Sequence, residues 1–189
     1  MTRLPNPCAD LADAALDYAA RRLDVFPCVP GGKRPLTEHG LDDATSDPDV
    51  IRRWWSRWPD ANIGIRTGVT FDVLDLDGAD GSDTMRALVA EHGRPPRGPA
   101  SHTPRDGWHV FFRTPARPVG NRARFIDSCD WRGERGYIIA PPSVGANGVP
   151  YTWARDLDVP LPDVPAWLLD LLHPPRPSLP ARRAVRLPP

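Results

Sequence analysis

The stretch FDVLDLDGAD, residues 71–80, carries acidic side chains in a segment whose apolar residues are typical of a buried strand. Asp75 stands between two leucines, and Asp77 follows directly after the second of them. A carboxylate buried away from water is costly unless a positive group meets it. The strand must therefore end where cations or basic side chains can reach both aspartates, and this requirement restricts the folds open to the chain.

Side chains alternate along a strand, so Asp75 and Asp77 are expected on the same face. Their Cα atoms would lie about 6.6 Å apart at about 3.3 Å per residue. Two carboxylates at this spacing can converge on one cation, or on two cations about 4 Å apart. Ligands that are all oxygen favour Mg²⁺ or Mn²⁺. The alternative is a turn in which the aspartates only cap the next helix.

The length and composition favour one domain, or one domain with a tail. Of the 189 residues, 40% are hydrophobic and seven are tryptophan, which is enough for a core. We predict one folded domain over residues 1–173. Residues 174–189 are rich in proline and carry four arginines and no acid, so we predict a disordered tail there.

The charge balance argues neither for nor against a nucleic-acid partner. The chain has 24 basic and 24 acidic residues and a formal net charge of zero. A bound polyanion would therefore have to meet a local basic groove or metal ions, because a general positive field is missing.

The three cysteines, Cys8, Cys28 and Cys129, are widely spaced and form no C-x-x-C pair, so neither a zinc site nor a disulfide framework is indicated. The N-terminus lacks the apolar core of a signal peptide, and no run approaches the ~20 apolar residues of a membrane span. The sequence therefore favours a cytoplasmic protein without a membrane partner.

The hydrophobic periodicity predicts a mixed α+β order, without the regular β-α alternation of a doubly wound sheet. Helices are expected over residues 10–23, from Pro48 through Trp58, from a cap at Ser82 to Gly93, and over 166–172. Strands are expected over 25–29, and over 62–68 and 70–78 as two adjacent strands. Two hairpins follow, over 100–114 with Arg105-Asp106-Gly107 as its turn, and over 123–143 with Trp131-Arg132-Gly133 as its turn.

Other polar residues are candidates for a site, although each has an ordinary structural interpretation. His109 begins the expected strand HVFF, on the same face as Phe111, and Asp130 stands just ahead of the last expected strand. A lone histidine on a strand is more often structural, and a loop aspartate often only bonds a turn. Ser143 fits a turn former close to the site. The candidate phosphate partners are Lys33, which is the only lysine of the chain, Arg34, Arg66 and Arg132.

Taken together, VLDLDG, RDGWHVFF and CDWRGERGYIIAPPS resemble, in order and spacing, the three motifs of the bifunctional primase-polymerase (prim-pol) domain of the archaeo-eukaryotic primase superfamily. The flanking segments ALDYAARRLDVFPCVPGGKRPL and DPDVIRRWWSRWPDANIGIRTG resemble the opening helix and strand of that family and its tryptophan-bearing helix. The resemblance spans roughly residues 10–172. It implies a small α/β module joined to an RRM-like unit with a mixed or antiparallel sheet.

The resemblance also implies a role for each motif. Asp75, Asp77 and Asp130 correspond to acidic ligands of two divalent ions, Mg²⁺ or Mn²⁺, and His109 corresponds to a histidine that contacts the phosphates of the incoming nucleotide. Arg132, Lys33 and Arg66 are expected to assist in nucleotide binding. A protonated imidazole would hold a phosphate oxygen more strongly than a neutral one, so the rate should fall as the pH rises past the pKa of the histidine.

The implied function is that of a metal-dependent, template-directed nucleotidyltransferase, a DNA primase and DNA polymerase acting in DNA replication. Its expected partners are nucleoside triphosphates, a single-stranded or primed DNA template, and a separate helicase. New primer synthesis is less expected than extension, because no accessory domain follows residue 172 and the cysteines cannot build a zinc-binding insertion. Two alternatives stay open: a non-catalytic module that binds single-stranded nucleic acid, and a D-x-D nucleotide-sugar transferase.

Overall fold

The computed structural model of the chain describes residues 7–173, and the expected tail over 174–189 lies outside this range. Its elements, in chain order, are α1 (Pro7–Ala20), β1 (Val25–Cys28), the 3₁₀ helix η1 (Gly40–Asp43), α2 (Pro48–Arg57), β2 (Asn62–Arg66), β3 (Phe71–Leu76), α3 (Gly78–His92), β4 (Ala100–His102), β5 (Trp108–Arg113), β6 (Arg122–Ile126), β7 (Cys129–Arg132), β8 (Tyr137–Ala140), β9 (Thr152–Arg155) and α4 (Ala166–Leu172).

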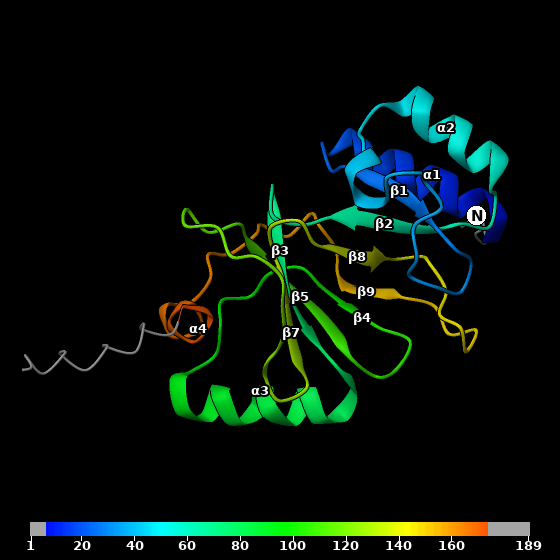
Figure 1. Cartoon of the computed structure of the whole chain (residues 1–189). Helices are drawn as coiled ribbons and strands as arrows, with labels where there is room; N and C mark the ends of the chain where they lie inside the picture. Colours follow the sequence, from blue (N-terminus) through cyan, green and yellow to red (C-terminus); the bar gives the residue numbers. More distant parts are fainter. Residues whose placement is uncertain (1–6, 174–189) are drawn as a thin grey trace, which may run out of the picture.

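The strands form two separate sheets, and every strand pair in them is antiparallel. The smaller sheet has three strands in the order β1-β2-β8, and the larger has six in the order β6-β7-β3-β5-β4-β9. Figure 1 shows α1 and α2 beside the smaller sheet, with α3 and α4 lying beside the larger one. This architecture confirms the predicted α+β class and its division into two units.

The start of α2 follows from local chemistry. Asp47 caps the helix, because its Oδ1 accepts hydrogen bonds from the backbone N–H groups of Asp49 and Val50 at 2.8 and 3.3 Å. Pro48 suits the first helical turn, where its missing N–H is no loss. The helix buries Ile51 and Trp55, as the sequence pattern predicted.

Two cores lie on opposite faces of the larger sheet, and the alternation along β3 divides its side chains between them. Phe71 and Val73 belong to the core shared with α1, α2 and the smaller sheet. Leu74 and Leu76 belong to the core that α4 completes with buried leucines. Asp75 therefore lies on the face that is directed toward the smaller sheet.

The predicted adjacency of the strands over 62–68 and 70–78 is wrong. β2 lies between β1 and β8 in the smaller sheet, so neither of its edges is open to β3. β3 lies between β7 and β5 in the larger sheet. The chain passes from one sheet to the other at Gly68, whose φ of 82° requires the conformational freedom of glycine.

The second predicted hairpin is also wrong in its boundaries. β6 pairs with β7 across Asp127 and Ser128, and β8 crosses to the smaller sheet. Trp131, expected in a turn, lies in β7, where it pairs with Leu74 of β3 and is fully buried in the second core. By contrast, the hairpin over 100–114 is confirmed as β4 and β5.

The helix boundaries differ from the predicted ones by a few residues. α3 begins at Gly78, four residues before the predicted cap at Ser82, whose hydroxyl donates to the Gly78 carbonyl at 3.2 Å. β3 ends at Leu76, and Gly78 turns the chain directly into the helix with a φ of 60°. α1 lies three residues ahead of its predicted position at both ends, over Pro7–Ala20.

Two further sequence predictions concern cysteines and membranes. Cys28 and Cys129 are buried and free. Over residues 7–173, no helix is both long and apolar enough to cross a bilayer.

Candidate functional site

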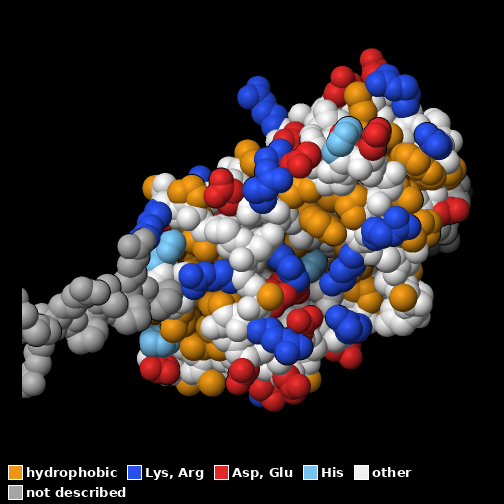
Figure 2. All heavy atoms as spheres, in the orientation of Figure 1, with side chains coloured by type: hydrophobic (Ala, Val, Ile, Leu, Met, Phe, Trp, Pro, Cys, Tyr) orange, Lys and Arg blue, Asp and Glu red, His pale blue; other side chains and the backbone are white. Residues whose placement is uncertain are grey.

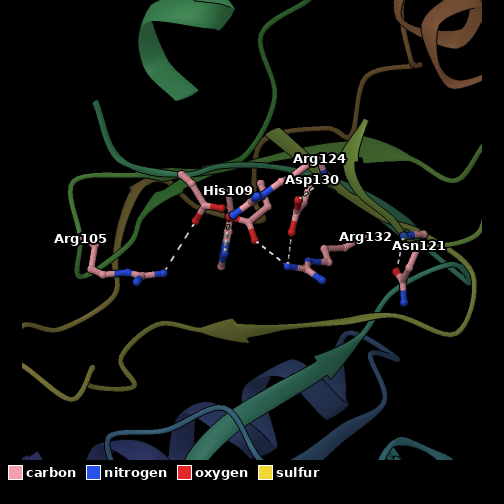
Figure 3. Close-up of polar contacts among 9 residues, drawn as sticks. Arg105, His109, Asn121, Arg124, Asp130 and Arg132 are labelled. Atoms are coloured by element: carbon pink, nitrogen blue, oxygen red, sulfur yellow. Dashed lines mark hydrogen bonds and ion pairs between the residues drawn. The ribbon is translucent and has the colours of Figure 1, made fainter. Parts of the chain in front are cut away.

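The candidate site is a row of side chains that runs across the larger sheet. Asp130 of β7 lies directly opposite Asp75 of β3, and Asp75 lies opposite His109 of β5. His109 in turn lies opposite Ser101 of β4. Directly opposed residues project from the same face of a sheet, so three separate sequence motifs come together in one line. In Figure 3, His109, Asp130 and Arg132 lie on the same side of this sheet.

The middle of the row, Asp75 and His109, opens into two neighbouring cavities between the sheets. The larger, of about 350 Å³, is lined by Asp75 and Asp77, by turn residues 31–33 and 103–105, and by residues 144–147 and Tyr151. The smaller, of about 130 Å³, contains His109 and Arg132. Lys33 and Asp75 line both cavities. Figure 2 shows acidic and histidine side chains near the middle of this face, with basic side chains around them.

Arg132 joins the two opposed aspartates. Its Nη2 donates to Oδ2 of Asp130 at 2.6 Å and lies 3.3 Å from Oδ2 of Asp75. Both aspartates are buried, so the guanidinium supplies the positive charge that their burial requires. The other oxygen of Asp130 accepts the backbone N–H of Arg124 at 2.7 Å. Arg132, which the sequence offered as a phosphate partner, therefore contacts two of the acidic residues.

His109 is buried beside Asp75, with Nε2 3.6 Å from its Oδ1. The ring stacks on Tyr151 at 5.9 Å between centroids. Burial lowers the pKa of His109 to about 4, although the charge of Asp75 acts in the opposite direction. The imidazole is therefore neutral near pH 7. The predicted fall in rate as the pH rises past the pKa of the histidine is therefore expected near pH 4 in the free protein.

Asp77 lies just beyond the end of β3, at the N-cap position of α3, but its side chain makes no capping hydrogen bond. Its backbone N–H is held by the Ser128 carbonyl at 2.9 Å. The carboxylate is half exposed and lies 3.9 Å from Nη2 of Arg105, in the turn between β4 and β5. Asp77 therefore presents its carboxylate to the larger cavity beside Arg105, and the helix-cap interpretation of this aspartate is not supported.

The position of that turn depends on Gly107. A Cβ at this residue would collide with the Leu76 carbonyl oxygen and with the Thr103 hydroxyl. Glycine thus lets the turn carrying Arg105 approach the end of β3, where Asp77 stands.

Within residues 7–173, no three His, Cys, Asp or Glu side chains converge closely enough to form a ready metal site. The donor chemistry nevertheless fits a hard divalent cation. Asp75 and Asp130 offer carboxylate oxygens on adjacent strands and already share one cationic group, and Asp77 lines the larger cavity beside Asp75. For both opposed aspartates to hold a metal ion, Arg132 would have to leave at least one of them.

The remaining candidates are placed differently. Lys33 borders both cavities, and its carbonyl accepts the Tyr137 hydroxyl at 3.0 Å. Arg66 and Arg34 line neither cavity. Ser143 is structural, because its buried hydroxyl accepts the backbone N–H of Ile63 at 2.8 Å.

Sequence reasoning missed several residues that surround the row. Arg105 was assigned only to a turn, although its place in RDG, four residues before His109, was a usable signal. Arg124, Tyr151 and Ser101 carried no local signal, because tertiary contacts alone bring them to Asp130 and His109.

The fold and the site define a class of protein: two antiparallel units with buried acids and a histidine facing a cleft bordered by basic residues. The chain belongs to the family of bifunctional DNA primase/polymerase N-terminal domains, whose family model matches residues 15–167. No curated protein matches the chain closely. Members of this family are generally metal-dependent nucleotidyltransferases that use nucleotides and a DNA template.

Proposed function

We propose that this protein is a DNA primase/polymerase that adds nucleotides to a DNA strand paired with a template. The observation that carries the proposal is the row formed by Asp130, Asp75 and His109 across three adjacent strands. It places the carboxylate of Asp75 where the two cavities meet, with the imidazole of His109 in the smaller cavity and Asp130 directly opposite Asp75. The all-antiparallel sheets argue against the alternative sugar-nucleotide transferase, which we would expect to contain a parallel βαβ domain.

The acidic residues are the proposed ligands of Mg²⁺ or Mn²⁺, with Asp75 between Asp130 and Asp77. When bound, the ions would lower the pKa of the attacking 3′-hydroxyl and stabilise the leaving pyrophosphate. Asp75 is buried and is fixed on both sides by neighbouring strands, so its carboxylate is oriented before any ligand arrives. This rigidity supports its role as the central ligand.

Basic and neutral donors around the acids are the proposed contacts of the triphosphate. Lys33 and Arg105 line the larger cavity, and Arg132 reaches the smaller one. On ligand binding, Arg132 would exchange its carboxylate partners for phosphate oxygens. His109, which is neutral, would donate a hydrogen bond from Nε2 and would add no net charge.

A nucleic-acid strand is the proposed ligand of β6 and the loop before it. β6 is an edge strand, and its Arg122 and Arg124 are exposed, as is Arg117 in the loop. The backbone of Arg124 contacts Asp130, so this basic edge borders the row of site residues. Exposed arginines beside the reacting groups match a phosphate backbone in charge.

A primer-extension assay with Mg²⁺ or Mn²⁺ tests the proposal. The wild-type protein should extend a primed template, whereas Asp75→Asn and Asp130→Asn should reduce incorporation at least about a hundredfold, because each removes a carboxylate from the proposed metal site. Both variants should stay folded, since the change removes one negative charge from a crowded group. Asp83→Asn is the matched control, because Asp83 is exposed on α3 and pairs with Arg86, away from the row.

Extension by either site variant at the wild-type rate would overturn the assignment. DNA binding by the wild-type protein without any incorporation would instead favour a non-catalytic binding module. The same assay on a template without primer tells new primer synthesis from extension.

A further inference from the structure

Two buried polar atoms without a hydrogen-bond partner belong to residues that lie opposite each other in the larger sheet. They are Oγ of Ser101 on β4 and Nδ1 of His109 on β5. Within residues 7–173, only four buried side-chain nitrogen or oxygen atoms lack a partner in this way. A buried polar atom without a partner is costly, so two of them on opposed residues call for a common explanation.

The geometry allows the two atoms to satisfy each other. Directly opposed residues in an antiparallel pair have Cβ atoms about 4.5–5.5 Å apart and project from the same face. Ser101 is completely buried and His109 is 2% exposed, so bulk water does not reach this pair. A change of the Ser101 side-chain rotamer, or one enclosed water molecule, would join Oγ to Nδ1.

The other contacts of the His109 ring leave Nδ1 available for a hydrogen bond with Ser101. Nε2 is the ring nitrogen that approaches Asp75, at 3.6 Å. Tyr151 contacts the ring through its face, at an interplanar angle of 27°, and does not compete for either nitrogen. A neutral imidazole has one nitrogen that donates and one that accepts, and the partner of one nitrogen decides the role of the other.

We infer that the Ser101 hydroxyl donates to Nδ1 of His109, directly or through one water molecule, and so fixes the tautomer that carries its proton on Nε2. The Nε2–H group is then held toward Asp75 and the smaller cavity. Ser101 is a positioning residue, because it acts on a ligand only through His109. The consequence for nucleotide binding rests on the proposed function, but the tautomer itself does not.

Nuclear magnetic resonance of the full chain with ¹⁵N-labelled histidine tests the inference. The His109 signals are assigned by their loss in His109→Gln. The wild-type ring should show a protonated Nε2 and a hydrogen-bonded, unprotonated Nδ1. In Ser101→Ala the Nδ1 signal should move toward that of a free or a protonated nitrogen, and in Ser101→Thr, which keeps the hydroxyl, it should stay close to wild type. An unchanged Nδ1 signal in Ser101→Ala, or a wild-type ring protonated on Nδ1, would overturn the inference.

Ser143→Ala is the matched control, because its hydroxyl is equally buried but accepts the Ile63 N–H at 2.8 Å. It should lower the melting temperature without moving the His109 signals. Ser101→Ala should also weaken nucleotide binding up to about tenfold at an unchanged metal-titration midpoint. A shifted Nδ1 signal with unchanged nucleotide affinity would overturn the positioning role. A shifted signal in a protein that transfers no nucleotide would refute the proposed function and leave the tautomer inference standing.

Discussion

The charge balance of the candidate site depends on the guanidinium of Arg132. Its Nη2 contacts Asp130 at 2.6 Å and Asp75 at 3.3 Å, and the side chain is 31% exposed. A partly exposed cation can neutralise the two buried acids before a metal ion arrives and can then move to a phosphate. Arg132 would in this way compete with the metal ion while also assisting the nucleotide.

Replacing Arg132 by methionine should therefore change metal and nucleotide binding in opposite directions. We expect Arg132→Met to bind Mn²⁺ about tenfold more tightly without nucleotide, because the competing cation is gone, and to bind nucleotide more weakly. Electron paramagnetic resonance of free Mn²⁺ measures the first effect. Arg135→Met is the control, since Arg135 pairs with Asp42 outside the site. Equal or weaker Mn²⁺ binding by Arg132→Met would contradict the competition.

His109 makes the stability of the metal-free protein sensitive to acid. Burial lowers its pKa from 6.5 to about 4, so between these values the unfolded chain binds a proton that the folded protein refuses. His109 thus costs stability as the pH falls from about 6.5 to about 4, with a slope of at most about 1.4 kcal/mol per pH unit.

Urea unfolding of His109→Gln and wild type across this range measures the effect, and the variant should lose less stability on acidification. His39→Gln is the control, because the hydrogen bond to Asp43 raises the pKa of His39, so its contribution to stability is complete below about pH 6.5 and is lost only as the pH rises above that value. Parallel pH profiles for His109→Gln and wild type would show that His109 is not neutral in the fold.

Asp72 changes the folding stability with pH in the opposite direction to His109. It therefore reduces the total loss of stability on acidification. Burial raises its pKa to about 6, although the Thr114 hydroxyl and the Trp131 indole N–H both donate to its carboxylate. The folded protein therefore takes up this proton before the unfolded chain does, and stability is gained as the pH falls below about 6. The comparison between variants, in which Asp72 is common to both, isolates the contribution of His109.

Among the elements, β6 offers the clearest separation of DNA binding from chemistry. The double variant Arg122→Gln, Arg124→Gln removes two exposed charges from an edge strand. It should bind a single-stranded oligonucleotide more weakly, with a salt slope shallower by about 0.7 for each lost phosphate contact. Fluorescence anisotropy at several salt concentrations measures the slope.

Arg53→Gln on the exposed face of α2 removes a charge of the same kind away from the site and should leave the slope unchanged. If the β6 variant and the α2 variant have the same slope as the wild type, the nucleic acid does not lie along β6.

In the molecule as a whole, the site lies between two sheets that the chain connects at neighbouring points. It leaves the smaller sheet near Thr67 and returns to it near Gly136, and the two passages are bonded together. The Thr67 backbone N–H donates to the Gly136 carbonyl at 2.9 Å, and the Thr67 hydroxyl donates to Gly133 at 2.7 Å. These bonds hold the two sides of the cleft at one end, while the cavities open between the sheets.

The domain division predicted from composition can be tested by truncation. A chain ending at His173 should keep the melting temperature within about 2 °C, because α4 and its buried Leu168 and Leu172 remain. Its affinity for nucleic acid at low salt should fall, since four arginines are removed. A chain ending at Pro165 is the contrasting variant, and loss of the two buried leucines should destabilise it by several kcal/mol. A large drop in melting temperature for the longer chain would show that residues 174–189 contribute to the fold.

The prediction from sequence succeeded where the signal is local. The cap and proline at Asp47 and Pro48 defined the start of α2, and alternation assigned the faces of β3 and β5 correctly. The spacing of VLDLDG, RDGWHVFF and the segment around Asp130 identified the family. No short stretch of sequence carries a signal for the pairing of strands that are far apart in the chain. For this reason β2 and β3 were wrongly predicted as adjacent strands, and β7 was wrongly predicted as a turn.

What the sequence determined by itself is the helices α1 to α4, most of the strands, the family and the candidate acids and histidine, because periodicity, caps and motif spacing act over a few residues. Tertiary structure alone decided that Arg132 contacts Asp75 and Asp130, that His109 is buried and neutral, and that Ser101 lies opposite it. These properties arise from burial and from contacts between strands far apart in the chain. Both depend on how the two sheets assemble, and no short stretch of sequence specifies that assembly.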